Sequence, residues 1–132
     1  MFEEIFIETA ELNNPQVLLP LATQGAANIL LKYFKPSSLI CMNRNRKELL
    51  AIQPGCYKLP ANFLRDDSRV SLIMGAFDLA YLPDLPPKYW YLSYQYVGKG
   101  GYLVGNVINK DKRFTRWLKA VNAENNNIVM VR

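Results

Sequence analysis

Residues 89–108 read YWYLSYQYVGKGGYLVGNVI. The first nine residues of this stretch are nearly all β-favouring, the next four are rich in glycine, and the last seven are again mostly apolar. Two β-favouring runs on either side of a short glycine-rich segment are typical of a hairpin. We therefore expect an aromatic β-hairpin over residues 89–108.

Two helices are expected outside this hairpin. Thr23 can cap a helix near residues 23–34, in which small and apolar side chains recur at helical spacing. Asp111 can cap a second helix near residues 111–123, whose apolar side chains follow one helix face. Short apolar runs separated by turn residues fill the remainder. The predicted fold class is α+β, with a mostly antiparallel sheet of about six to eight short strands and these two helices.

The charges are unevenly distributed along the 132 residues, which we expect to form a single domain over 1–132. The net charge is +5, from 16 basic and 11 acidic side chains. Four acids and no base stand in the first eleven residues, so the remainder carries 16 basic against seven acidic side chains. We expect residues 1–11 to form an extended acidic N-terminal arm or an edge strand.

The residue types restrict the available chemistry. Without histidine the chain has no Ser-His-Asp triad, no Cys-His pair and no imidazole base. Cys41 and Cys56 are too few for a zinc site, and we expect two reduced, half-buried thiols rather than a disulfide. The acids that could gather into a metal or acid–base site are Asp66, Asp67, Asp78 and Asp84. Turn formation explains the adjacent pair among them better. The sequence therefore predicts no catalytic residue, no metal, no cofactor and no enzyme.

Protein–protein contact is the first functional hypothesis. Both faces of the predicted hairpin are aromatic, and an acidic arm could dock on the basic surface of a neighbouring subunit. This pattern favours a non-enzymatic structural or assembly protein, a homo-oligomer or a small repeated subunit of a large particle such as a bacteriophage virion. The candidate partner-binding residues are Glu3, Glu4, Glu8, Glu11, Trp90, Tyr91, Tyr94 and Tyr96.

Single-stranded nucleic-acid binding is the alternative hypothesis, ranked below protein partners. Tyrosines stacked beside lysines and arginines could bind bases and phosphates through the hairpin and the C-terminal helix. The candidate residues are Lys99, Lys110, Lys112, Arg113 and Arg116. No apolar run is long enough to cross a bilayer, and the acidic start does not resemble a signal peptide. We expect no membrane partner and an intracellular location, or a virion if the first hypothesis holds.

Overall fold

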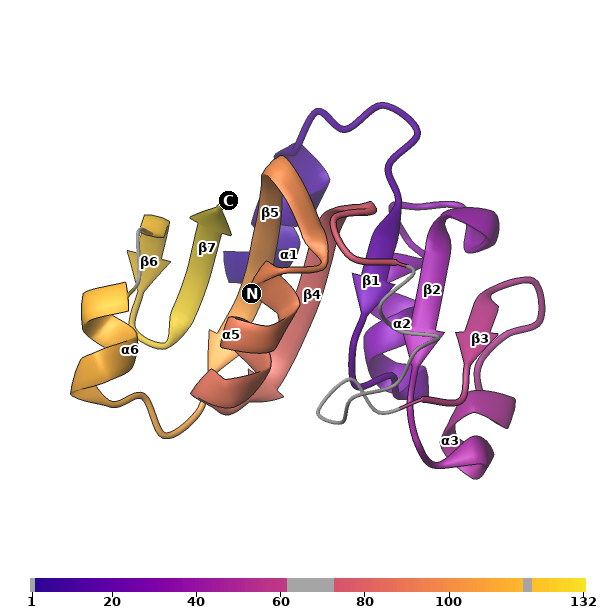
Figure 1. The fold of residues 1–132 in the computed structure, drawn as a ribbon. Coiled ribbons are helices and arrows are strands. Elements are labelled where there is room, and N and C mark those ends of the chain that lie inside the picture. The colour runs from indigo at the N-terminus through magenta and orange to yellow at the C-terminus, as the bar shows by residue number, and fades with distance from the viewer. Residues whose placement is uncertain (1, 62–72, 118–119) are drawn as a thin grey trace.

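In the part of the chain that the structure describes, seven strands form one sheet in the order β3-β2-β1-β4-β5-β7-β6 (Figure 1). This computed structural model describes residues 2–61, 73–117 and 120–132. The strands are β1 Val17–Leu19, β2 Leu39–Met42, β3 Tyr57–Leu59, β4 Phe77–Leu85, β5 Val97–Val107, β6 Ala120–Glu124 and β7 Asn127–Val131. The strands from β3 through β5 in the sheet pair in parallel, whereas β7 is antiparallel to both of its neighbours, β5 and β6.

Helices cover both faces of this sheet. They are α1 Phe2–Thr9, α2 Gln24–Leu30, α3 Arg46–Leu50, α5 Pro87–Tyr94 and α6 Lys112–Trp117, with a 3-10 turn η1 at Pro36–Ser38. In Figure 1, α5 lies in front of β4 and β5, while α1 and α2 lie behind the sheet. Val17, Leu18 and Leu19 of β1 are each 0% exposed, because a parallel strand between two helical layers is buried on both sides.

The predicted α+β class is therefore wrong, since the structure is an α/β fold with a mostly parallel sheet. The expected helix start at Thr23 is present, and the Thr23 side chain accepts a hydrogen bond from the Ala26 N–H at 3.3 Å. This helix ends at Leu30, earlier than expected. The error lies in how the strands are connected, because short apolar runs look alike in parallel and antiparallel sheets.

The predicted hairpin over 89–108 does not form. Residues 87–94 are helix α5, which connects β4 to the parallel strand β5. Pro86 is the N-cap residue and Pro87 opens the helix, a position where a missing N–H and a fixed φ are favourable. Trp90 and Ser93, three residues apart, are the buried positions of α5. Tertiary packing of this face overrides the β-propensity of the aromatic residues.

The glycine-rich segment 98–101 lies inside β5 and makes no hairpin turn. A Cβ atom at Gly101 would lie 2.5 Å from the Val97 side chain and 3.0 Å from the Asp78 carbonyl oxygen. Gly100 has a φ of +84°, where the pairing with β4 is irregular. Gly101 therefore allows close packing of β5 against β4, and Gly100 supplies the positive φ of the irregular stretch.

The two ends of the chain also differ from expectation. Residues 2–9 form helix α1, with Ile7 buried against the sheet, instead of an extended arm or edge strand. The second expected helix begins after Asp111, whose carboxylate accepts from the Phe114 N–H at 2.7 Å, but α6 ends at Trp117. Strand β6 starts at Ala120, inside the range predicted as helix. Among the described residues, no helix is long and apolar enough to cross a membrane.

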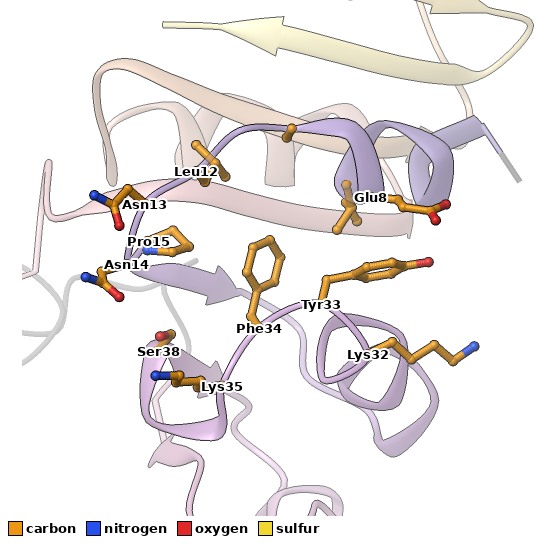
Figure 2. Close-up of a pocket in the computed structure, with 12 residues that line it drawn as sticks. Glu8, Leu12, Asn13, Asn14, Pro15, Lys32, Tyr33, Phe34, Lys35 and Ser38 are labelled. Carbon is orange, nitrogen blue, oxygen red and sulfur yellow. The ribbon is translucent and has the colours of Figure 1, made fainter.

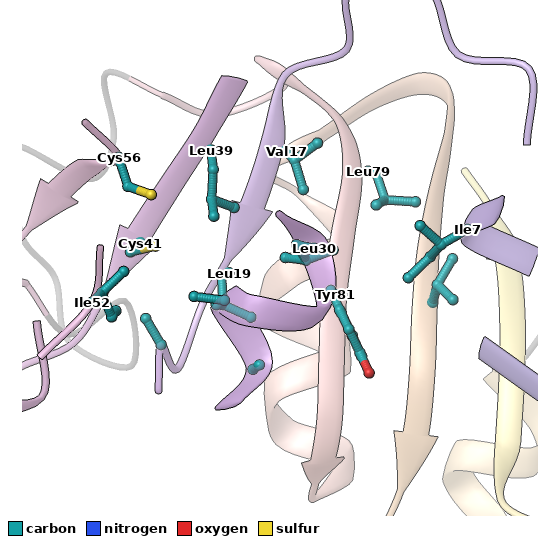
Figure 3. Close-up of a cluster of buried hydrophobic side chains, with 14 of the residues drawn as sticks. Ile7, Val17, Leu19, Leu30, Leu39, Cys41, Ile52, Cys56, Leu79 and Tyr81 are labelled. Carbon is teal, nitrogen blue, oxygen red and sulfur yellow. The ribbon is translucent and has the colours of Figure 1, made fainter. Parts of the chain in front are cut away.

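The layer formed by α1, α2 and α3 encloses an apolar cluster (Figure 3). It includes Leu19, Leu30 and Tyr81, and its outer part holds Cys41 and Cys56 as free, buried thiols. Burial and the neighbouring Cys56 raise the pKa of the Cys41 thiol to about 12. Cys41 is therefore protonated at neutral pH and is a poor nucleophile.

Candidate functional site

The order in which the chain adds strands to the sheet reverses between β1 and β4. From β1 the chain proceeds to β2 and β3 on one side, and it then returns to place β4 on the other side of β1. At such a switch point the connections leave in opposite directions and open a crevice at the carboxyl ends of the two strands, where ligands bind in open α/β sheets.

A hollow of about 350 Å³ lies at this place. Its walls are mostly apolar with a few polar groups, which is typical of small-molecule sites. The lining residues come from the loop after β1, from α2, and from the carboxyl ends of β4 and β5: Leu21, Thr23, Ala26, Ile29, Tyr81, Pro83, Asp84, Leu85 and Asn106.

Asp84 is held in a fixed position at the end of β4. Its φ is +53°, a left-handed value that aspartate adopts more readily than most residues, and the register of β4 with β5 shifts there. The Asp84 N–H donates to Asn106 Oδ1 at 2.8 Å, and Asn106 Nδ2 donates back to Asp84 Oδ1. This reciprocal pair orients the carboxylate in the wall of the hollow.

Tyr81 brings an unsatisfied polar group to the same hollow. Tyr81 is 0% exposed, and its hydroxyl has no hydrogen-bond partner. Figure 3 shows this hydroxyl at the edge of the apolar cluster, directed along β4 toward its carboxyl end. Burial, followed by the charges of Glu3, Glu4 and Asp84, raises the pKa of Tyr81. The phenol therefore stays protonated at neutral pH and keeps a hydrogen to donate.

Asn43 connects the loops that follow β1 and β2. Its side chain is buried, Nδ2 donates to the Ala22 carbonyl at 2.8 Å, and Oδ1 accepts from the Asn45 N–H at 2.9 Å. The backbone adds a bond from the Ala22 N–H to the Met42 carbonyl at 2.8 Å. These bonds hold the loops after β1 and β2 together at the carboxyl edge of the sheet, beside the hollow.

The four acids predicted to bind a partner are separated by the structure. Glu3, Glu4 and Glu8 belong to α1, and Glu11 follows it. Glu3 is fully buried and cannot meet another subunit, whereas Glu8 and Glu11 are exposed. A helix turns its side chains in different directions, so these acids do not form the continuous strip that an extended arm would present.

The four aromatic residues predicted to bind a partner are largely internal. Trp90 is 0% exposed and Tyr96 is 4% exposed, which removes both from any surface. The rings of Tyr91 and Tyr94, both half-buried, stack edge-on against Trp117 with centroid distances of 4.7 and 5.4 Å. The aromatic residues therefore attach α6 to α5.

The structure brings together four of the five basic residues predicted for nucleic acid. Lys110, Lys112 and Arg116 line a shallow hollow of about 370 Å³, and exposed Arg113 pairs with Asp111 at 3.8 Å. Lys99 lies near the start of β5, whereas Lys110 follows the end of this strand. Lys99 is therefore separated from the other four.

A larger hollow, of about 520 Å³, lies at the opposite edge of the sheet (Figure 2). Residues 13–15 enter β1 there, and residues 32–35 follow α2, with the Phe34 ring facing Pro15 in Figure 2. This amino-terminal edge contains no switch point, so its size does not make it the candidate ligand site.

The sequence hypothesis missed Tyr81, Asn43 and Asn106. Asp84 was considered as an acid and set aside, and Asp66 and Asp67 lie outside the described residues. The usable signal was the apolar run that begins at Phe77 and ends in Pro83-Asp84, because polar residues directly after a buried parallel strand mark the ligand edge. Among the described residues, no three carboxylate or thiol side chains cluster closely enough to hold a metal ion.

Three solved structures that share this fold carry the name of a methyltransferase or a methylase. A methyltransferase from Geobacter sulfurreducens has a TM-score of 0.67 at 13% identity, over 99% of this chain and 78% of its own. A putative rRNA-methylase from Clostridium thermocellum has a TM-score of 0.64 at 10% identity, over 98% of this chain and 91% of its own. The T. thermophilus 16S rRNA N2 G1207 methyltransferase, solved with AdoMet and guanosine, has a TM-score of 0.56 at 17% identity, over 96% of this chain and 37% of its own. No protein-family model and no curated protein matches the sequence.

These likenesses correct the functional predictions. At 10–17% identity they establish the fold, and it is a fold on which the named neighbours are enzymes. The predictions of a non-enzymatic assembly protein and of a virion component are contradicted. The argument from missing histidine was wrong, because it considered only the chemistry of side chains and ignored a reaction carried by a bound small molecule. Homo-oligomerisation stays a prediction.

Proposed function

We propose that this chain is a methyltransferase that binds S-adenosylmethionine in the crevice between the carboxyl ends of β1 and β4. The observation that carries the proposal is the hollow at the switch point, lined by the oriented carboxylate of Asp84 and the unpaired hydroxyl of Tyr81. When bound, S-adenosylmethionine supplies an electrophilic methyl group on a positively charged sulfonium.

The polar groups of the hollow suit a cationic ligand. Asp84 brings a carboxylate to a mostly apolar wall, and because this side chain is exposed, water partly screens its interaction with a positive charge. Asn106 holds the carboxylate through two hydrogen bonds and leaves Oδ2 outside them. Asp84 is therefore the residue that would face the sulfonium, and Asn106 would keep it in place.

The part of the crevice that would bind the nucleoside of S-adenosylmethionine offers fewer of the contacts expected in this fold. Nucleotide-binding α/β folds commonly place glycines in the turn after the first strand and an acid about 20 residues further on, which binds the ribose hydroxyls. This chain has Pro20, Leu21 and Ala22 in the turn, and Asn43 at the end of β2. Since Asn43 already bonds to Ala22 and Asn45, we expect weak ribose recognition and most of the affinity from the other end of the ligand.

The test compares two ligands that differ in one charge. S-adenosylhomocysteine has a neutral thioether where S-adenosylmethionine has the sulfonium. We expect Asp84→Asn to weaken S-adenosylmethionine binding about tenfold, the size of one partly screened charge pair, and to leave S-adenosylhomocysteine binding unchanged. Isothermal titration calorimetry measures both dissociation constants.

Asp78→Asn is the matched control, because Asp78 is an exposed acid near the opposite end of β4. It should leave both dissociation constants unchanged. If Asp84→Asn weakens the binding of both ligands equally, the role given to Asp84 is contradicted. Absence of binding of either ligand to the wild-type chain would contradict the proposed function itself.

The basic residues of α6 stay a prediction for a nucleic-acid methyl acceptor. Helix α6 begins soon after the end of β5, which places its first turn near the carboxyl edge of the sheet (Figure 1). We expect Lys112→Glu to weaken binding of a labelled RNA oligonucleotide more than fivefold at low salt, because phosphate contacts are electrostatic. Lys99→Glu makes the same charge change far from α6, and an equal loss in this variant would contradict a specific surface.

A further inference from the structure

We infer that the methyl acceptor is a nucleic-acid strand whose phosphates cross the carboxyl edge of the sheet, from basic residues after β2 to basic residues after β5. This inference rests on the proposed function, because it names the substrate class of the same site. The surface that binds the strand includes a second basic cluster, on the other side of the hollow from α6.

Three basic side chains follow directly after β2 and form the β2 cluster. Arg44 lies in the loop, and Arg46 and Lys47 open helix α3. All three are exposed, and none of them forms an ion pair with another described residue. Glu48, the acid of α3, offsets one of the three charges. The β2 cluster therefore keeps positive charge that a partner can neutralise.

The β5 cluster follows the end of β5. It consists of the exposed side chains of Lys110, Lys112, Arg113 and Arg116. Of these four, Arg113 alone has an acidic partner among the described residues, Asp111 at 3.8 Å. Lys88, exposed in the first turn of α5 after β4, adds a cation between the two clusters in the order of the sheet.

The two clusters lie on opposite sides of the hollow, at the same edge of the sheet. Figure 1 shows α3 at the lower right and α6 at the lower left, at the edge where the arrows of β1, β2, β4 and β5 end. Neighbouring strands are about 4.8 Å apart, so the ends of β2 and β5, three spacings apart, are separated by about 14 Å.

This width fits a short piece of a nucleic-acid strand. Successive phosphates of a stacked strand are about 3.4 Å apart along its axis, so roughly four nucleotides cover it. A strand that contacts both clusters passes over the hollow between β1 and β4, where one of its bases can enter.

The amino-terminal edge of the sheet has no such excess of positive charge among the described residues. Lys32 and Lys35 share the larger hollow there with Glu8. Lys99 near the start of β5 is matched by Asp78 near the start of β4. The positive charge is therefore concentrated on the edge that contains the switch point, and a polyanion is attracted to that edge.

A phosphodiester chain matches this edge better than an acidic protein does. Protein–protein interfaces have an apolar core, whereas protein–nucleic-acid interfaces are more polar and far more basic. The turns beside the β5 cluster are made of exposed asparagines, Asn109 before Lys110 and Asn125, whose carbonyl accepts from Lys110 Nζ at 3.5 Å. Asparagine side chains contact both phosphates and base edges.

The experiment measures binding of a labelled uridine 12-mer to the full chain by fluorescence anisotropy at several salt concentrations. One double variant, Arg46→Gln with Lys47→Gln, changes the β2 cluster, and another, Lys112→Gln with Arg116→Gln, changes the β5 cluster. Each should weaken binding more than fivefold at low salt. Each should also reduce the slope of log affinity against log salt by about 1.4, which is about 0.7 for each lost phosphate contact.

Lys32→Gln with Lys35→Gln is the matched control, because it removes two exposed cations at the opposite edge. It should leave both the affinity and the slope unchanged. Analytical ultracentrifugation should find one strand per chain, because one strand contacts both clusters. Two strands per chain, or an equal loss in the control, would overturn the inference.

Two other polyanions identify the partner. A thymidine 12-mer carries the same phosphates on deoxyribose: tighter binding of the uridine strand assigns the acceptor to RNA, and tighter binding of the thymidine strand assigns it to DNA. Poly-glutamate that binds as tightly as both, with the same losses in the two cluster variants, would overturn a nucleic-acid partner.

The titrations contain no S-adenosylmethionine, so they are independent of the proposed function. If the wild type binds S-adenosylmethionine but the β2-cluster variant binds RNA as the wild type does, the crossing strand is overturned while the proposed function stands. If the chain binds the strand as expected but neither S-adenosylmethionine nor S-adenosylhomocysteine, the proposed function fails. The strand is then a ligand of this edge, and its role as methyl acceptor is overturned.

Discussion

Trp90→Ala should lower the free energy of unfolding by about 3–5 kcal/mol, the usual cost of removing a large buried aromatic side chain. Trp90 is 0% exposed in the cluster between α5 and the sheet, and its ring meets Phe114 of α6 edge-on at 5.9 Å. The variant should lose part of the attachment of both α5 and α6. Urea unfolding followed by circular dichroism measures the change.

Trp90→Phe isolates the contribution of packing. The Trp90 Nε1–H has no hydrogen-bond partner, so this variant loses volume but no hydrogen bond, and it should cost much less than the alanine variant. Tyr57→Ala removes an aromatic side chain that is 71% exposed, and it should change the unfolding free energy by less than about 0.5 kcal/mol. A loss in Trp90→Ala as small as that in Tyr57→Ala would contradict the position given to α5.

Trp90 also explains why the sequence predicts the wrong fold. Tyrosine and tryptophan favour strands on average, but a residue's environment decides, and Pro86 and Pro87 already marked a helix start. The local signals that are independent of tertiary contacts were predicted correctly, as for the helix caps at Thr23 and Asp111. The parallel pairing of β4 with β5 depends on contacts across the connecting helix, which local patterns do not contain.

The candidate site was harder to predict for a related reason. The importance of Asp84 comes from its place at the switch point, and Glu3 is buried only because α1 packs on the sheet. Glu3 was noted for its charge as part of an exposed arm. Its burial follows from helix formation, which puts it one turn from Ile7 on the inward face.

Gly105→Ala is expected to lower stability by about 1–3 kcal/mol and to weaken ligand binding as well. A Cβ atom at Gly105 would lie 2.3 Å from the Leu82 carbonyl oxygen and 2.6 Å from the Leu82 carbonyl carbon. Both atoms belong to the backbone of β4, which cannot turn aside as a flexible side chain would. The strands must separate, and this happens next to the Asp84–Asn106 pair that lines the hollow.

The matched control is Gly25→Ala in α2. A Cβ atom at Gly25 would have no neighbour within 4 Å, and alanine is the better helix former by up to about 1 kcal/mol. We therefore expect Gly25→Ala to leave the chain equally stable or more stable, so that the same substitution has opposite effects at the two glycines. If Gly105→Ala keeps wild-type stability and binding, then β4 and β5 are not held at this close approach. The Asp84 carboxylate, which we propose to face a sulfonium, would then be supported by its hydrogen bonds with Asn106 and not by this close approach of the strands.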